Sequence, residues 1–68
     1  MEFKVDGEFI KLDSLLKAAN AVSSGGEAKI MILNEEVLVN GETETRRGKK
    51  IYPGDIIEFE NNKIKVES

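Results

Sequence analysis

Three tight-turn signals divide the second half of the chain into short extended segments. The Asn-Gly pair at residues 40–41 fits a two-residue hairpin turn, because both residues tolerate positive φ. Pro-Gly-Asp at residues 53–55 is typical of a second turn, and Asn-Asn at residues 61–62 marks a third. The sequence therefore predicts short strands at residues 37–39, 42–45, 56–59 and 63–66.

The first half carries the spacing of a helix instead. Apolar residues at positions 12, 15, 16 and 19 fall at i, i+3, i+4 and i+7, which places them on one stripe. Asp13 is the expected N-terminal cap, and the helix is expected to end near Asn20.

A second helix is predicted to begin at Ser24. Residues 24–27 read Ser-Gly-Gly-Glu, a capping box in which Ser24 accepts from the third helical amide and Glu27 reaches back to the Ser24 amide. Residues 28–33 are apolar on nearly every side, so a buried strand is the alternative. The cap favours the helix, as does the weakening effect of Gly25 and Gly26 on a strand.

The first ten residues have the pattern of an antiparallel hairpin. Phe3 precedes and Phe9 follows an Asp-Gly pair at residues 6–7, within alternating apolar segments. Phe3, Phe9 and Phe59 are assigned to the core.

The order of these elements defines the expected fold class. Two strands, two helices and then several strands indicate a single α+β domain over residues 1–68. We expect two short helices packed on a small, mostly antiparallel sheet.

The composition removes most catalytic chemistry. The 68 residues include no cysteine and no histidine, so thiol nucleophiles, ordinary zinc sites and the usual neutral-pH base are missing. We therefore expect no enzyme activity, no metal, no cofactor and no small-molecule substrate.

No stretch approaches the roughly 20 apolar residues of a bilayer span, and no signal core is seen, so a cytoplasmic location without a membrane partner is expected.

Basic charge is concentrated in one predicted loop. The chain has a net charge of −3, yet residues 46–50 read Arg-Arg-Gly-Lys-Lys and hold four of its ten basic residues. Cations around Gly48 suit a curved phosphate backbone, and arginine adds bidentate hydrogen bonds. The candidate contacts are Arg46, Arg47, Gly48, Lys49 and Lys50. The alternative is a solvated loop that keeps the protein soluble.

Weaker candidates lie on the helices and beside the loop. Gly25 and Gly26 leave amides uncovered where the helix dipole favours an anion, although Glu27 competes and a plain capping box is the alternative. Tyr52 either stacks on an unpaired base or covers the core. Three lysines extend the basic surface if they face the loop: Lys11, Lys17 and Lys29. The loop meets the helix pair only if it folds back toward Ser24.

Several of these segments resemble the alpha-L RNA-binding domain, the S-four-like family named after the fourth protein of the small ribosomal subunit. Lys11-Leu12-Asp13 is similar to its opening of helix one, and Ser24 with Ala28 and Ile32 to its helix two. Residues 37–41 and 53–57 are similar to its closing elements. The resemblance spans roughly residues 9–60 and is greatest for small stand-alone bacterial members.

The resemblance implies a non-enzymatic module that binds structured RNA, either ribosomal RNA or a ribosomal particle, through its helix pair and an adjoining loop. Applied to the matching positions of this chain, the resemblance implies that Lys11, Ser24 and Lys29 contact RNA. The family usually has arginine after the serine of helix two, where this chain has Gly25. The loop at residues 46–50 is expected to compensate for that missing contact.

Two other interpretations stay open. A β-grasp carrier has a similar element order, but its chemistry needs a C-terminal Gly-Gly, whereas this sequence ends Val66-Glu67-Ser68. A protein-docking module would use the apolar surface of the second helix and direct the basic loop at an acidic partner.

Overall fold

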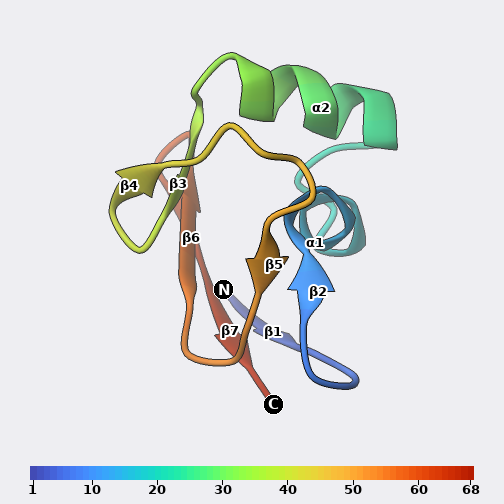
Figure 1. The fold of residues 1–68 in the computed structure, drawn as a ribbon, viewed down its shortest axis with the longest axis vertical. Helices are drawn as coiled ribbons and strands as arrows, with labels where there is room; N and C mark the ends of the chain where they lie inside the picture. Colours follow the sequence, from blue (N-terminus) through green and yellow to red (C-terminus); the bar gives the residue numbers. More distant parts are fainter.

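A computed structural model describes residues 1–68 and contains two helices and seven short strands. In chain order these are β1 (Glu2–Lys4), β2 (Ile10–Lys11), α1 (Leu12–Ala18), α2 (Gly25–Leu33), β3 (Val37–Val39), β4 (Glu42–Thr43), β5 (Lys50–Ile51), β6 (Ile56–Phe59) and β7 (Asn62–Glu67). The predicted order of elements and the α+β class are confirmed (Figure 1).

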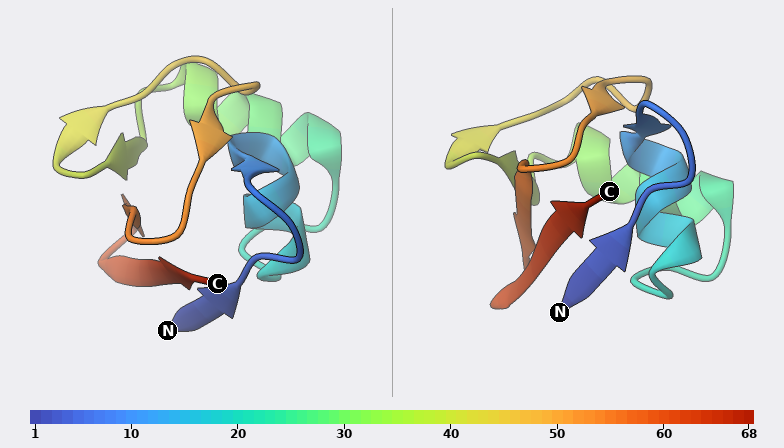
Figure 2. Two further views of the ribbon diagram at one scale, coloured as in Figure 1. Left: turned by 60° about the horizontal axis from the view of Figure 1, so that its bottom comes forward. Right: turned by 90° about the horizontal axis from the view of Figure 1, so that it is seen from below.

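The strands form two separate sheets. The larger has the order β1-β7-β6-β3-β4, in which only the β1–β7 pair is parallel. The smaller is an antiparallel ribbon of β2 and β5. The helices and this ribbon close the open side of the curved larger sheet (Figure 2).

The predicted N-terminal hairpin is wrong. Phe3 lies opposite Val66 of β7, whereas Ile10 lies opposite Ile51 of β5, so β1 and β2 belong to different sheets. Gly7 has a φ of 110°, and the chain crosses between the sheets around it. The parallel pairing of β1 with β7 buries Val5 against the core, a long-range gain that overrides the local turn signal.

The core is entirely apolar. All 15 buried residues are hydrophobic, and no polar or charged residue is buried, so every titratable group lies at or near the surface. The stripe of α1 is confirmed, since Leu12, Leu15 and Leu16 are fully buried. Phe59 also lies in the core and Phe3 packs against it, as expected.

The start of α1 differs from the prediction. Its N-terminal cap is Lys11, which makes no side-chain cap hydrogen bond, and Asp13 lies inside the first turn. The Leu12 amide donates to the Lys49 carbonyl (2.9 Å) and the Asp13 amide to the Arg47 carbonyl (3.1 Å). A distant loop therefore supplies the acceptors that a capping side chain usually provides.

The second helix is confirmed, with a modified cap. The Ser24 hydroxyl accepts from the Glu27 amide (3.2 Å), as predicted. The Glu27 carboxylate accepts from the Ser23 amide (3.3 Å) and hydroxyl (3.0 Å), not from the Ser24 amide. Because α2 is apolar on both sides, Ile30 and Leu33 stay 61% and 56% exposed while its inner residues are buried.

The turns at residues 40–41 and 53–55 are confirmed and are joined by side chains. Asn40 and Gly41 have φ values of 51° and 85°, as the hairpin requires. The Asn40 amide group donates to Asp55 (3.0 Å) and its oxygen accepts from the Ile56 amide (2.9 Å). Asp55 in turn accepts from the Tyr52 amide (2.8 Å). These bonds hold the two turns together.

The third turn lies one residue earlier than predicted. Glu60 and Asn61 have φ values of 44° and 66°, and Phe59 lies opposite Asn62. Burial of Phe59 and Ile64 on the core side determines this register, because a one-residue shift would turn them outward.

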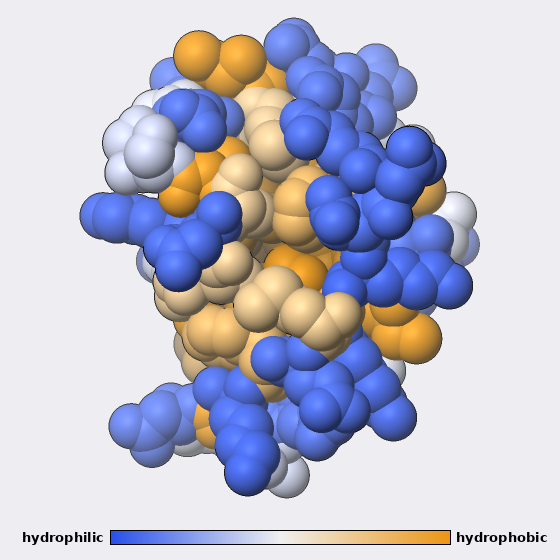
Figure 3. Space-filling model, turned by 180° about the vertical axis from the view of Figure 1, so that it is seen from behind, coloured by the Kyte–Doolittle hydropathy of each residue, from blue (hydrophilic) through white to orange (hydrophobic).

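The reverse side of the molecule carries an apolar stripe between polar flanks (Figure 3). Partly buried Phe3, Ala19 and Ala21 pack against the core, and Met1 is 66% exposed.

Neither helix has the length and apolar character required to cross a bilayer.

Candidate nucleic-acid interface

The basic loop at residues 46–50 lies between β4 and β5, with Lys50 as the first residue of β5, and it is fixed against the start of α1. The carbonyls of Arg47 and Lys49 accept from the first amides of that helix, and the Lys49 amide donates to the Arg46 carbonyl (3.2 Å). The loop was expected to reach the helix pair at the Ser24 end of α2, but no hydrogen bond joins them there. The loop is bonded to the start of α1 instead. Figure 1 shows the loop running from β4, below α2, toward α1 and then into β5.

Both arginines of the loop form ion pairs, which sequence reasoning missed. Arg46 donates from Nε (3.0 Å) and a terminal nitrogen (3.2 Å) to the two carboxylate oxygens of Glu44. Arg47 Nε lies 3.5 Å from a carboxylate oxygen of Asp13. The arginine side chains nevertheless remain 70% and 56% exposed. The two carboxylates orient the guanidinium groups and leave them accessible, but they also compete with an incoming phosphate for the guanidinium N–H donors.

The Glu44 carboxylate is strongly stabilised in its ionised form. The hydrogen bond from the Arg46 side chain lowers the pKa of Glu44 from 4.5 to about 2, and the same contact raises the pKa of Arg46. The stabilisation from this pair is therefore fully present above about pH 4.5 and is lost as the pH falls through about 2.

Replacing Arg46 by glutamine is expected to move the pKa of Glu44 from about 2 back toward 4.5, because the main stabilising donor is removed. A carbon-13 NMR titration of the Glu44 carboxyl group measures this shift. Arg47→Gln is the matched control and should leave the Glu44 titration unchanged. A parent protein whose Glu44 already titrates near its ordinary value would contradict the ion pair.

Two lysines lie directly opposite each other on the small ribbon. Lys11 of β2 pairs in register with Lys50 of β5, and both are exposed. Neither forms an ion pair. Like charges at opposite positions repel, so an anion bound between them would relieve the repulsion. Lys50 also lines a surface groove together with Arg46, Lys49 and Tyr52.

The same ribbon carries an aromatic pair outside the core. The rings of Phe9 and Tyr52 have centroids 5.9 Å apart at an angle of 47°. The Lys50 ammonium lies 4.9 Å from the centre of the Phe9 ring. The assignment of Phe9 to the core is therefore wrong, since it is only partly buried and is not among the residues packed against the core. Strand alternation turns Ile10 and Ile51 inward and their neighbours outward.

The other predicted residues are more dispersed. Lys17 lies in the last turn of α1, at the end remote from the loop contacts. Ser24, Gly25 and Gly26 form the start of α2, and Lys29 is exposed farther along that helix. A β-carbon at Gly25 or Gly48 would have no neighbour within 4 Å, so packing does not require glycine at either position.

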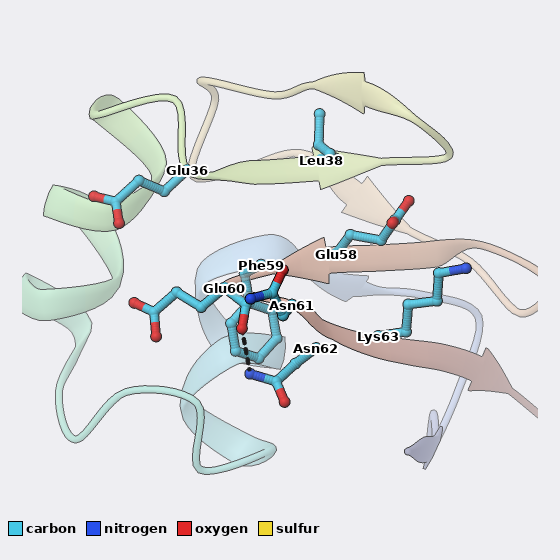
Figure 4. A pocket seen from close by; sticks show the side chains of 8 residues that line it. All are labelled: Glu36, Leu38, Glu58, Phe59, Glu60, Asn61, Asn62 and Lys63. Atoms are coloured by element: carbon cyan, nitrogen blue, oxygen red, sulfur yellow. Dashed lines mark hydrogen bonds between the residues drawn. The ribbon is translucent and has the colours of Figure 1, made fainter.

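A different face of the molecule is acidic. Glu36, Glu58 and Glu60 surround a shallow hollow on the outer side of β3, β6 and β7, with Lys63 at one edge (Figure 4). Three carboxylates on this face disfavour phosphate, whereas the loop side carries the highest concentration of basic residues in the chain. No group of three or more His, Cys, Asp or Glu side chains is arranged to hold a metal ion.

Comparison with protein families identifies the fold. The model of the S4 domain family matches residues 3–67. The chain belongs to the S4 domain family. The resemblance to this family seen in the sequence is thereby confirmed, and so is the prediction of two short helices packed on a mostly antiparallel sheet.

Two relatives of this S4 domain are informative. The probable ribosome maturation protein RlbA of Bacillus subtilis is 48% identical over 56 residues, which are 82% of this chain and 79% of RlbA. YbcJ of Escherichia coli is 37% identical over 57 residues, 84% of this chain and 81% of YbcJ. The solution structure of YbcJ, described as an alpha-L motif involved in RNA binding, superposes with a TM-score of 0.76 at 32% identity, over 98% of this chain and 86% of the other.

Proposed function

We propose that this S4 domain is a non-enzymatic module that binds structured RNA through the loop at residues 46–50 and the adjoining β2–β5 ribbon. The observation that carries the proposal is the accessible group of cations fixed at the start of α1 on an otherwise acidic chain. Membership of the S4 family and the description of YbcJ as carrying an RNA-binding motif support RNA over other polyanions.

The proposed contacts divide into two kinds. The exposed guanidinium groups of Arg46 and Arg47 donate hydrogen bonds to phosphate oxygens in exchange for part of their bonding to Glu44 and Asp13. The ammonium groups of Lys11, Lys49 and Lys50 act as point charges along the same surface. Such contacts bind and orient a nucleic acid without reacting with it, and they read its backbone and shape.

The start of α2 forms a second proposed contact. With the Glu27 carboxylate bonded to Ser23, the amides of Gly25 and Gly26 have no internal acceptor and can donate to a phosphate. Ser24 and Lys29 flank them. Lys17, at the far end of α1, would join only with an RNA that extends along that helix.

Ribosomal RNA or an assembling ribosomal particle is the proposed target. The support is the name of RlbA, a probable ribosome maturation protein that is 48% identical to this chain over most of its length. A cytoplasmic site of action is part of the same proposal.

Fluorescence anisotropy with structured ribosomal RNA fragments and matched duplex DNA tests the proposal. With about five phosphate contacts, the logarithm of affinity should fall against the logarithm of salt with a slope of about −3.5 to −4.5. RNA should bind more tightly than DNA at each salt concentration, because the 2′-hydroxyl and the A-form shape distinguish them. Absence of RNA binding at low salt, or equal affinity for both nucleic acids, would contradict the proposal.

A protein-docking role is the second candidate, favoured by the exposure of Ile30 and Leu33 one turn apart on α2. It predicts a native complex that survives nuclease treatment and is disrupted by Ile30→Ser with Leu33→Ser. The RNA-binding proposal predicts that nuclease dissociates the complex and that these substitutions leave RNA affinity unchanged.

A further inference from the structure

We propose that the outer face of the β2–β5 ribbon is a stacking site for an unpaired RNA base, with Tyr52 as the stacking surface, Phe9 as its support and Lys50 as the adjacent phosphate contact. This inference rests on the proposed RNA-binding function and specifies which kind of RNA the domain prefers. The preferred RNA would carry an unpaired nucleotide beside a helical segment.

The register of the ribbon places these side chains together. Ile10 opposes Ile51 with both directed to the core, and Lys11 opposes Lys50 on the outer side. Continuing the alternation by one residue brings Phe9 opposite Tyr52 on that same outer side, where their rings lie 5.9 Å apart. The outer face of the ribbon therefore carries two aromatic rings next to two cations.

Packing within the protein does not account for the exposed tyrosine ring. Tyr52 is 45% exposed and makes no side-chain hydrogen bond, and neither it nor Phe9 belongs to the group of residues packed on the core. The position of Tyr52 is nonetheless fixed, because its amide donates to Asp55 (2.8 Å) and its ring lies against Phe9. A solvent-facing ring that is supported on one side by Phe9 offers a base a flat stacking partner.

The charges around the ring match a nucleotide. Tyr52 lines a surface groove with Arg46, Lys49 and Lys50, and an RNA backbone that contacts these cations would pass beside the ring. The groove continues past Glu44 and Asp55, whose carboxylates already accept hydrogen bonds within the protein. The Lys50 ammonium sits 4.9 Å from the Phe9 ring centre, which holds it at the ribbon rather than over the loop. A base on Tyr52 would bring its own phosphate to Lys50 and Lys11.

The test compares an RNA hairpin that has an unpaired loop with a blunt RNA duplex of the same stem. Tyr52 is the only tyrosine and the chain has no tryptophan, so intrinsic fluorescence reports on this ring alone. We expect the hairpin to quench this emission and the duplex to leave it largely unchanged. Tyr52→Ala should weaken hairpin binding by about 5- to 100-fold and leave duplex affinity unchanged, whereas Tyr52→Phe should retain both affinities.

Leu33→Ala, which removes an apolar side chain of comparable exposure on α2, is the matched control and should change neither affinity. Circular dichroism of each variant excludes loss of fold as the cause. If the parent binds RNA in a salt-dependent manner but Tyr52→Ala binds the hairpin as well as the parent does, the stacking inference fails and the proposed function stands. If the parent binds no RNA at all, both fail.

Discussion

Replacing Arg46 and Arg47 by glutamate is expected to weaken binding to structured RNA by about 100-fold or more. Each reversal removes a phosphate contact and adds a repulsive charge at the same place, and a loss of about 1.4 kcal/mol per position already multiplies to that factor. The salt slope should also become shallower by about 1.4 to 1.8, because two fewer phosphates are neutralised. Fluorescence anisotropy across a salt series measures both effects.

Two controls separate charge from fold. The reversal places a new carboxylate beside Glu44 and another beside Asp13, so the neutral pair Arg46→Gln with Arg47→Gln should show an intermediate loss without that local repulsion. Lys63→Glu with Lys65→Glu makes the same charge change on exposed positions of β7, away from the loop. It should cost less than about 3-fold at physiological salt, because its distant charges are screened. Equal losses from both reversals would show that only net charge matters.

An Ile57→Ala protein is expected to lose about 2–5 kcal/mol of unfolding free energy. Ile57 is fully buried in β6, between Val39 of β3 and Ile64 of β7, so truncation leaves a cavity that rigid neighbouring strands fill poorly. A chain of 68 residues has a total stability of only about 3–10 kcal/mol. We therefore expect the midpoint of thermal unfolding to fall by at least about 10 °C, measured by circular dichroism.

The adjacent residue provides the control for that experiment. Ile56 is 37% exposed and points to the other face of the same strand. Its bonds to Asn40 involve only backbone atoms of Ile56, so Ile56→Ala preserves them. A loss below about 1 kcal/mol is expected. Similar losses for the two variants would mean that β6 does not have one buried and one exposed face.

Local chemistry made much of the fold predictable from the sequence. Asn40-Gly41 has the positive φ values that its turn requires, and the apolar stripe at residues 12–16 and the Ser24 cap both describe helices that form. The basic loop was visible because its four cations are close in sequence. Asn40 and Asp55 were recognised as turn residues, but the hydrogen bond between them was not, because they are fifteen positions apart in the sequence.

The sequence by itself therefore determined the two helices, the turns at residues 40–41 and 53–55, and the concentration of basic charge in one loop. Only the tertiary structure decided that β1 pairs with β7 and that Arg47 forms an ion pair with Asp13. It also decided that Phe9 packs against Tyr52 outside the core. The physical reason is the distance along the sequence between the residues that interact. Turns, caps and helical stripes depend on residues a few positions apart, whereas strand pairing and ion pairs depend on which distant segments bury the most apolar surface together.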